Sequence, residues 1–419
     1  DDVHILEHLD RLVEIFNVCW PMYAAMPAIL KEAIERAYVA TGWDLVSSEN
    51  KNGRKFPNFA DILEQIETVI NESKYSADCK GDYSGALLTR VRSLTTGLNG
   101  LIFCNDDIPN EDLFDKSVIV DLSRVGSTET KSLIMGLLVM KLNEYRMSSG
   151  KINSSLSHIT VLEEAHNLLK RTSTEQSSEG ANLLGKSVEL LANSIAEMRT
   201  YGEGFVIADQ SPGLLDMSVI RNTNTKIVLR LPDRSDRELV GYAAGLNDEQ
   251  IDELSKLRRG VAAVYQNDWV EPVLVQVNKC ELDETAYDFS AIVAGIEKNN
   301  IREQLLNLLI QGRVREKLDY SVWNIEKGLG TLALSTLNTE FVEEQIAEYK
   351  EHNSLELWSD ENFRWLSKRL TDILDVRTKV ENCVLTAADN DELTNMLRKI
   401  VLQISPEASK AKIIALSQC

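Results

Sequence analysis

The sequence lacks any hydrophobic run long enough to span a membrane, and no apolar segment typical of a signal peptide lies near its start. These absences argue against a membrane or secreted protein, so we expect a cytoplasmic location. Cysteine is scattered, without a CxxC pair or a Cys/His spacing typical of a metal site. We therefore expect reduced thiols and no structural metal. The histidines form no catalytic pattern either, and His166 is expected to be structural.

Positive charge is also scarce. The chain has 45 Lys and Arg residues against 65 Asp and Glu residues, which gives a formal net charge of −20. A protein that covers nucleic acid with an open face carries a basic patch, and this composition excludes such a patch over most of the surface. Any DNA contact must be confined to a small positive feature, such as the inner loops of a ring. The alternative is a protein that does not need DNA.

Two β-prone runs end in polar side chains. The first, 158–162, leads directly into Glu163 and Glu164, and the second, 204–208, leads into Asp209 and Gln210. A P-loop NTPase uses paired acids at the end of a buried strand to hold Mg²⁺ and to activate the attacking water. The alternative for an isolated acidic pair is a strand end capped by a solvated acidic turn. With the second run, the pattern favours nucleotide hydrolysis.

The spacing of apolar residues divides the chain into three parts. Residues 1–112 carry helix-period stripes, and residues 283–419 are charged and helical, with no recognisable chemistry. Between them, residues 113–282 alternate helices with short β-branched runs. Runs of this kind, separated by helices, predict a parallel α/β sheet buried on both faces. The expected strands are 118–122, 159–162, 205–208, 227–231, 261–265 and 273–277.

One segment, Gly180–Ser187, matches the phosphate-binding pattern GxxxxGK[ST] letter for letter. A true P-loop hangs between a buried strand and a helix. Here a polar Ser/Thr/Gln-rich stretch precedes the match, which also follows the acidic pair instead of preceding it. We therefore interpret this match as a decoy. The sequence contains no other match.

Several motifs occur in a fixed order that resembles the HerA branch of the HerA/FtsK ring ATPases. The strongest are Glu163–Leu169, Glu197–Gly204, Ala208–Pro212 and Asn224–Leu231, joined by Asp121–Ser127 and His8–Leu12. The resemblance covers roughly residues 1–282. It implies a RecA-like parallel-sheet ATPase core at 113–282, with 1–112 as a helical insertion and 283–419 as a C-terminal helical domain. It also implies a P-loop before the region that matches His8–Trp20. Because the chain begins with Asp1, we expect a C-terminal portion or a sequence without its upstream residues.

The resemblance also implies ATP and Mg²⁺ as cofactors and assigns roles to five residues. Glu164 would be the catalytic base, and Glu163 would organise Mg²⁺ through water. Gln210 would sense the γ-phosphate. The alternative is a structural role, in which the Gln210 amide connects the strand to the following loop. Arg199 is a candidate arginine finger that reaches the neighbouring subunit's ATP, and Arg230 is a second candidate. The alternative for both arginines is an ordinary surface ion pair.

Three basic residues, Lys170, Arg171 and Lys186, flank the Ser/Thr/Gln-rich stretch. In a ring, this segment would line the pore and contact phosphates without regard to sequence. The alternative is a flexible surface loop.

The leading hypothesis is a subunit of a hexameric ATPase that couples ATP hydrolysis to translocation of double-stranded DNA for a partner nuclease or antiphage effector. The competing hypothesis is a ring-shaped scaffold that assembles and gates an effector enzyme, with ATP as a switch. The acidic charge and the helical C-terminal part favour protein partners, whereas the set of hydrolytic residues favours turnover.

Overall fold

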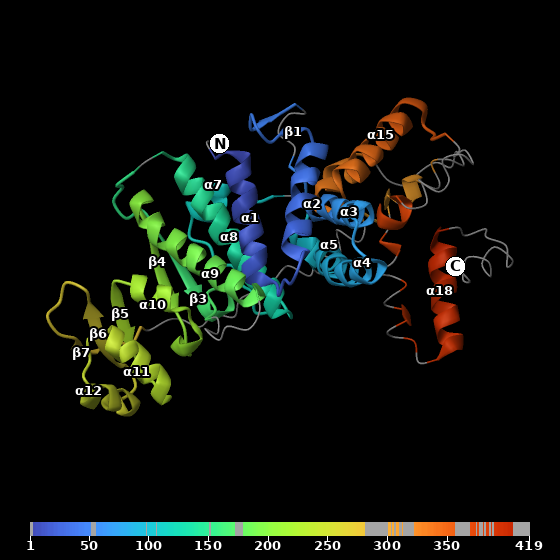
Figure 1. Cartoon of the computed structure of the whole chain (residues 1–419). Helices are drawn as coiled ribbons and strands as arrows, with labels where there is room; N and C mark the ends of the chain where they lie inside the picture. Colours follow the sequence, from blue (N-terminus) through green and yellow to red (C-terminus); the bar gives the residue numbers. More distant parts are fainter. Residues whose placement is uncertain are drawn as a thin grey trace. The chain divides into compact units, whose positions relative to one another are not determined.

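A computed structural model gives the fold of the chain (Figure 1). By its contacts the chain divides into two compact units: Asp1–Lys31 with Leu45–Ser48 and Ile108–Ala286, and Glu32–Asp44 with Glu49–Asp107 and Tyr287–Cys419. The structure describes residues 3–404 apart from 52–55, 98, 106, 151, 172–178, 281–300, 303, 306, 310–311, 313–321, 357–368, 374, 377–379, 381–382, 385–386 and 388.

Long helices form the frame of the first unit. Helix α1 (Ile5–Cys19) packs against α8 (Thr128–Ser148) and α9 (Glu179–Glu197). The buried stripe on α1 is the one that the 3–4 spacing predicts. Gly136 of α8 permits a close approach, because an added Cβ would lie 2.8 Å from Cγ2 of Ile15. Two shorter helices of this unit are α7 (Asn110–Phe114) and α10 (Met217–Asn222).

The strands β3 (His158–Glu163) and β4 (Glu203–Ala208) form a parallel pair, joined by a crossover that contains α9. This confirms the α/β class that the sequence predicts. One face of the pair is open: Ile159, Val161 and Val206 are each about half exposed. The expected burial on both faces is therefore wrong for β3 and β4, since strand side chains alternate and only the opposite face, which carries Leu162, is covered.

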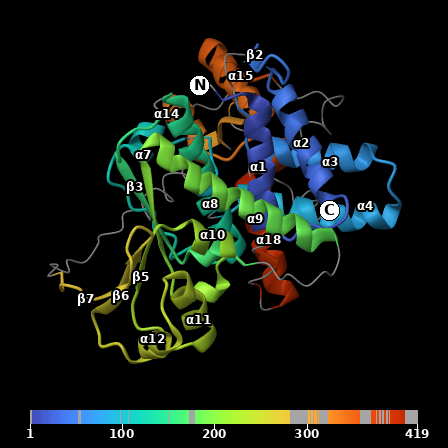
Figure 2. The same ribbon diagram turned by 60° about the vertical axis from the view of Figure 1, so that its left-hand side comes forward.

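Three further strands form a separate antiparallel sheet in the order β5 (Thr225–Val228), β6 (Val261–Gln266), β7 (Val273–Gln276). Parallel pairing was the wrong prediction here. The six residues between β6 and β7 are too few for the crossover that parallel strands require, so a hairpin forms. Helices α11 (Arg234–Ala243) and α12 (Asp248–Glu253) lie beside this sheet (Figure 2). They bury Val228, Ala263 and Ile251 in a small core.

The expected strand at 118–122 is absent, which corrects the sequence prediction. These residues have no assigned helix or strand, and Ile119 is 94% exposed. A strand needs a partner that satisfies its backbone groups. No described strand pairs with this segment, so its β-propensity is not realised.

The second unit is mainly helical. The Asp61 carboxylate, in the first turn of α3 (Phe59–Glu72), accepts hydrogen bonds from the backbone N–H and the hydroxyl of Thr336, at 2.7 and 2.9 Å. Burial raises the pKa of this carboxyl. Thr336 begins α15 (Thr336–His352), so residues from the expected insertion and from the expected C-terminal domain share one unit. The three-part division of the chain remains an expectation.

The other elements of the second unit are helices and one small antiparallel ribbon. Of the residues 283–419 that the sequence predicts to be helical, 361–368 lie outside the described residues, and so do 303 and 306. Helix α2 (Met26–Ala40) begins in the first unit and continues into the second at Glu32. The remaining elements are β1 (Trp43–Asp44), β2 (Glu49–Asn50), α4 (Ala77–Tyr83), α5 (Thr89–Thr95), α6 (Asn99–Ile102), α14 (Val322–Gly328) and α18 (Asn390–Ile404).

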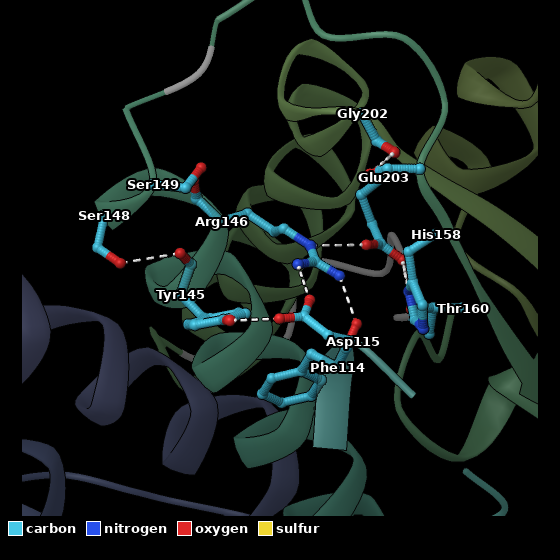
Figure 3. A network of polar contacts seen from close by, with 11 residues as sticks. Phe114, Asp115, Tyr145, Arg146, Ser148, Ser149, His158, Thr160, Gly202 and Glu203 are labelled. Atoms are coloured by element: carbon cyan, nitrogen blue, oxygen red, sulfur yellow. Dashed lines mark hydrogen bonds and ion pairs between the residues drawn. The ribbon is translucent and has the colours of Figure 1, made fainter. Parts of the chain in front are cut away.

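A buried polar network fixes the amino-terminal ends of β3 and β4 (Figure 3). The side chain of Glu203, fully buried, accepts from Nε of Arg146 at 3.0 Å and from the Thr160 hydroxyl at 2.7 Å, and it pairs with Nδ1 of His158 at 2.7 Å. Arg146 also pairs with Asp115 at 2.8 Å. The network connects the end of α8 to both strands at their amino-terminal ends. The carboxyl ends of β3 and β4 take no part in it.

Candidate active site

The carboxyl ends of β3 and β4 meet at one edge, because the register pairs Glu163 with Ala208. Glu164 follows the first strand, and Asp209 and Gln210 follow the second. The side chains of Glu163 and Gln210 are exposed. The structure therefore brings together the acidic pair and the amide that the sequence singled out.

Glu164 occupies a left-handed backbone conformation, with φ 50° and ψ 47°. Its carbonyl accepts hydrogen bonds from the backbone N–H and the side-chain amide of Asn167, both at 2.9 Å. A non-glycine residue in this region costs about 1–3 kcal/mol, and such strain concentrates at functional sites. Below the turn, Ala165 and Leu168 are fully buried and hold it in place. The Glu164 carboxylate itself is half exposed, where a water molecule can reach it.

Asp209 is a site residue that the sequence reasoning did not select. Its side chain is only 3% exposed, and Oδ2 lies 2.8 Å from Nδ1 of His166 and accepts the His166 backbone N–H at 2.9 Å. Oδ1 accepts the Ser211 backbone N–H at 2.8 Å. The available signal was its position as the first residue after β4, at the same edge as Glu163.

Carboxylate and amide oxygens dominate this edge, and they suit a hard cation such as Mg²⁺. Among the described residues, no group of three or more His, Cys, Asp or Glu side chains could hold a metal ion by itself. Protein sites often bind Mg²⁺ through one or two carboxylates together with the phosphates of a nucleotide. The donors at this edge fit that pattern, with Glu163 as the exposed carboxylate available for it.

The two candidate arginines lie elsewhere. Arg199 is exposed in the 3₁₀ turn Met198–Tyr201, which precedes β4. The six residues of β4 separate its two ends by roughly 16 Å, more than an arginine side chain spans, so Arg199 does not reach the edge that carries Glu164. Arg230 follows β5, and its Nε donates to the Ser255 carbonyl at 3.1 Å.

The basic residues that flank the Ser/Thr/Gln-rich stretch separate into two places. Lys170 forms an antiparallel bridge with Leu215, and the Arg171 N–H donates to the Leu214 carbonyl at 2.6 Å. Both therefore lie beside the segment that follows Gln210. Lys186 is exposed on α9. Residues 172–178, the centre of the stretch, lie outside the described residues.

The GxxxxGK[ST] match is helical. Gly180–Ser187 lies within α9 and is therefore helical. A phosphate-binding loop would instead need an irregular backbone at these residues. The hydroxyl of Ser187, the group that binds Mg²⁺ in a P-loop, is buried and donates to the Glu14 carboxylate of α1. This geometry supports the interpretation of the match as a decoy.

No helix among the described residues is long and apolar enough to cross a bilayer. No family model matches the chain. The chain is similar to curated proteins, two of which are named DNA double-strand break repair helicase HerA. The one from Sulfurisphaera tokodaii is 22% identical over 258 residues, which is 61% of this chain and 47% of the relative. The one from Sulfolobus acidocaldarius is 26% identical over 226 residues, which is 53% of this chain and 43% of the relative.

Among solved structures, that of VirB4 of Thermoanaerobacter pseudethanolicus matches with a TM-score of 0.46 and 14% identity, over 66% of this chain and 70% of that one. The chain spans less than half the length of the curated relatives that it matches. The similarity to these two helicases supports the resemblance of this chain to the HerA-like branch of the HerA/FtsK ATPases, which its ordered motifs indicate.

Proposed function

We propose that the chain forms the hydrolytic part of an ATPase whose nucleotide binds at the carboxyl edge of β3 and β4. One observation carries the proposal: Glu163, Glu164 and Gln210, from two separate motifs, meet at this single edge. A strained turn presents the Glu164 carboxylate at the half-exposed side of the edge. Such an arrangement is suited to orienting a water molecule.

In this proposal, Glu164 takes a proton from the water that attacks the γ-phosphorus, and ADP and inorganic phosphate leave. Glu163 would hold Mg²⁺ through water, and the cation would supply positive charge to neutralise the phosphates. The Gln210 amide, exposed at the end of β4, donates to the γ-phosphate. Nothing in this scheme uses Gly180–Ser187, whose residues are part of α9.

We place the arginine finger in trans. Arg199 lies at the amino end of β4, so it can complete only a neighbouring subunit's site, and a closed ring supplies that neighbour. The two relatives are named as DNA double-strand break repair helicases, and a hexamer around double-stranded DNA would suit such an activity. Lys170 and Arg171, beside the site, and Lys186, on α9, would contact DNA phosphates. A partner nuclease or antiphage effector would use the movement.

The second candidate is a ring-shaped scaffold that assembles and gates an effector, with ATP as a switch. The net charge of −20 favours it, because an acidic ring repels DNA outside a small positive feature. Two measurements on the natural gene product separate the functions: binding of a DNA duplex across a salt series, and ATP turnover with and without that duplex. A motor binds with a steep salt dependence and turns over faster on DNA. A scaffold shows neither effect and responds to its protein partner.

A further inference from the structure

The His166 ring has a defined orientation beside Glu164. Nδ1 of His166 lies 2.8 Å from Oδ2 of Asp209, and the same oxygen accepts the His166 backbone N–H at 2.9 Å. Because an ionised carboxylate only accepts hydrogen bonds, Nδ1 must carry the hydrogen in this pair. Asp209 is itself fixed, since it is nearly fully buried and also accepts the Ser211 N–H.

The same nitrogen faces the Glu164 carboxylate. Oε2 of Glu164 lies 3.6 Å from Nδ1 of His166, a distance that allows an ion pair but exceeds a hydrogen bond. Among the described residues, no side chain or backbone group donates a hydrogen bond to this carboxylate. The imidazole edge is thus a polar group beside the Glu164 carboxylate, and the Glu164 side chain is about half exposed.

We propose that the Asp209–His166 pair positions Glu164 for catalysis: Asp209, at the end of β4, orients the imidazole, and the imidazole restricts the Glu164 carboxylate at the end of β3. His166 and Asp209 are positioning residues that act through Glu164. The inference rests on the proposed ATPase function. It predicts an effect on kcat and little effect on KM, since neither side chain is assigned a contact with ATP.

Two substitutions separate positioning from simple support of the fold. His166→Asn keeps an N–H donor near the place of Nδ1, within reach of both Asp209 and Glu164. His166→Gln keeps an amide of similar bulk but places its donor near Nε2. We expect His166→Asn to retain kcat within about threefold and His166→Gln to lose about tenfold or more, both with KM for ATP nearly unchanged.

The chain offers a matched control at the other end of β3. His158 also contacts a fully buried carboxylate through Nδ1, that of Glu203 at 2.7 Å, and its side chain has the same 25% exposure as His166. His158→Gln should lower the melting temperature as much as His166→Gln does, yet leave kcat unchanged. Activity and melting are measured on the natural gene product for all the variants.

The positioning role is overturned if His166→Gln keeps full kcat, or if His158→Gln loses as much kcat as His166→Gln. A folded His166→Asn variant with at least tenfold lower kcat also overturns it, so the test does not depend on the Gln variant folding. Failure of the ATPase proposal looks different: Glu164→Gln would then turn over ATP at the normal rate. Loss of turnover in Glu164→Gln with full turnover in His166→Gln rejects the positioning role alone.

Discussion

The Arg146 guanidinium donates to the Glu203 carboxylate at 3.0 Å, with the Arg146 side chain 10% exposed and that of Glu203 fully buried. This ion pair joins α8 to β4 at the strand ends opposite the site. Breaking a buried pair leaves one charge without compensation, which is more costly than the pair itself is stabilising.

We therefore expect Arg146→Met to lower the free energy of unfolding by about 3–5 kcal/mol. Arg234→Ala is the control, because Arg234 pairs with Glu238 at the surface and its side chain is 82% exposed. Arg234→Ala should leave the free energy of unfolding nearly unchanged, because the ion pair of Arg234 is solvated. Denaturant unfolding followed by circular dichroism measures both. Equal stability of the two variants would contradict the account of the network.

The Cys19 thiol should be unreactive at ordinary pH. Burial, opposed by a hydrogen bond from the Ser132 hydroxyl, raises the pKa of Cys19 to about 12. The neutral thiol is then favoured in the native state, so its contribution to stability is complete below the ordinary thiol pKa and is lost as the pH rises through about 12. Only the thiolate reacts with alkylating reagents.

Iodoacetamide at pH 8, followed by mass spectrometry, should therefore modify the exposed Cys79 and leave Cys19 intact until the protein is denatured. Rapid native modification of Cys19 at the same rate as Cys79 would show that α1 does not bury this thiol as described.

Lys186→Ala should leave ATP affinity nearly unchanged. Lys186 is exposed on α9, and the neighbouring Ser187 hydroxyl is occupied by Glu14. Equilibrium binding of a fluorescent ATP analogue to the natural gene product measures this. A loss of affinity of about tenfold or more would identify Gly180–Ser187 as the phosphate loop and would reverse the assignment.

Arg199→Ala subunits should fold and bind ATP without hydrolysing it, because Arg199 serves the neighbouring site in this account. When they are mixed with Glu164→Gln subunits, part of the activity should return, since some interfaces then combine an intact Glu164 with an intact Arg199. Steady-state ATP turnover across mixing ratios gives the readout. Turnover by a strict monomer would rule out a trans-acting arginine. Rescue with Arg230→Ala but not with Arg199→Ala would move the finger to Arg230.

The patterns within single segments predicted much of this fold, because the apolar residues that mark α1, α3, α8 and the β3–α9–β4 unit as helices and strands lie within each segment. The direction in which neighbouring strands pair was harder to predict from the sequence. The β6–β7 hairpin depends on the length of its connection, and residues 118–122 have β-propensity but no partner strand within the part of the chain that the structure describes. Propensity is local, whereas pairing is decided by tertiary contacts.

The candidate site was predicted only in part, because some of its contacts follow from local patterns and others depend on the tertiary structure. The meeting of Glu163 and Gln210 follows from two parallel strands that end together. Asp209 and His166 were missed as a pair because their contact joins residues 43 positions apart, and the sequence pattern of neither segment indicates it.

In the proposed function, Glu164 is the base in ATP hydrolysis. Glu164→Gln replaces a carboxylate with an amide of nearly the same shape that cannot take a proton. The decisive measurement is steady-state ATP turnover by this variant of the natural gene product, with nucleotide affinity measured on the same sample. We predict that turnover falls by about 10²-fold or more while affinity and assembly are retained. Turnover equal to that of the unsubstituted protein would contradict the claim.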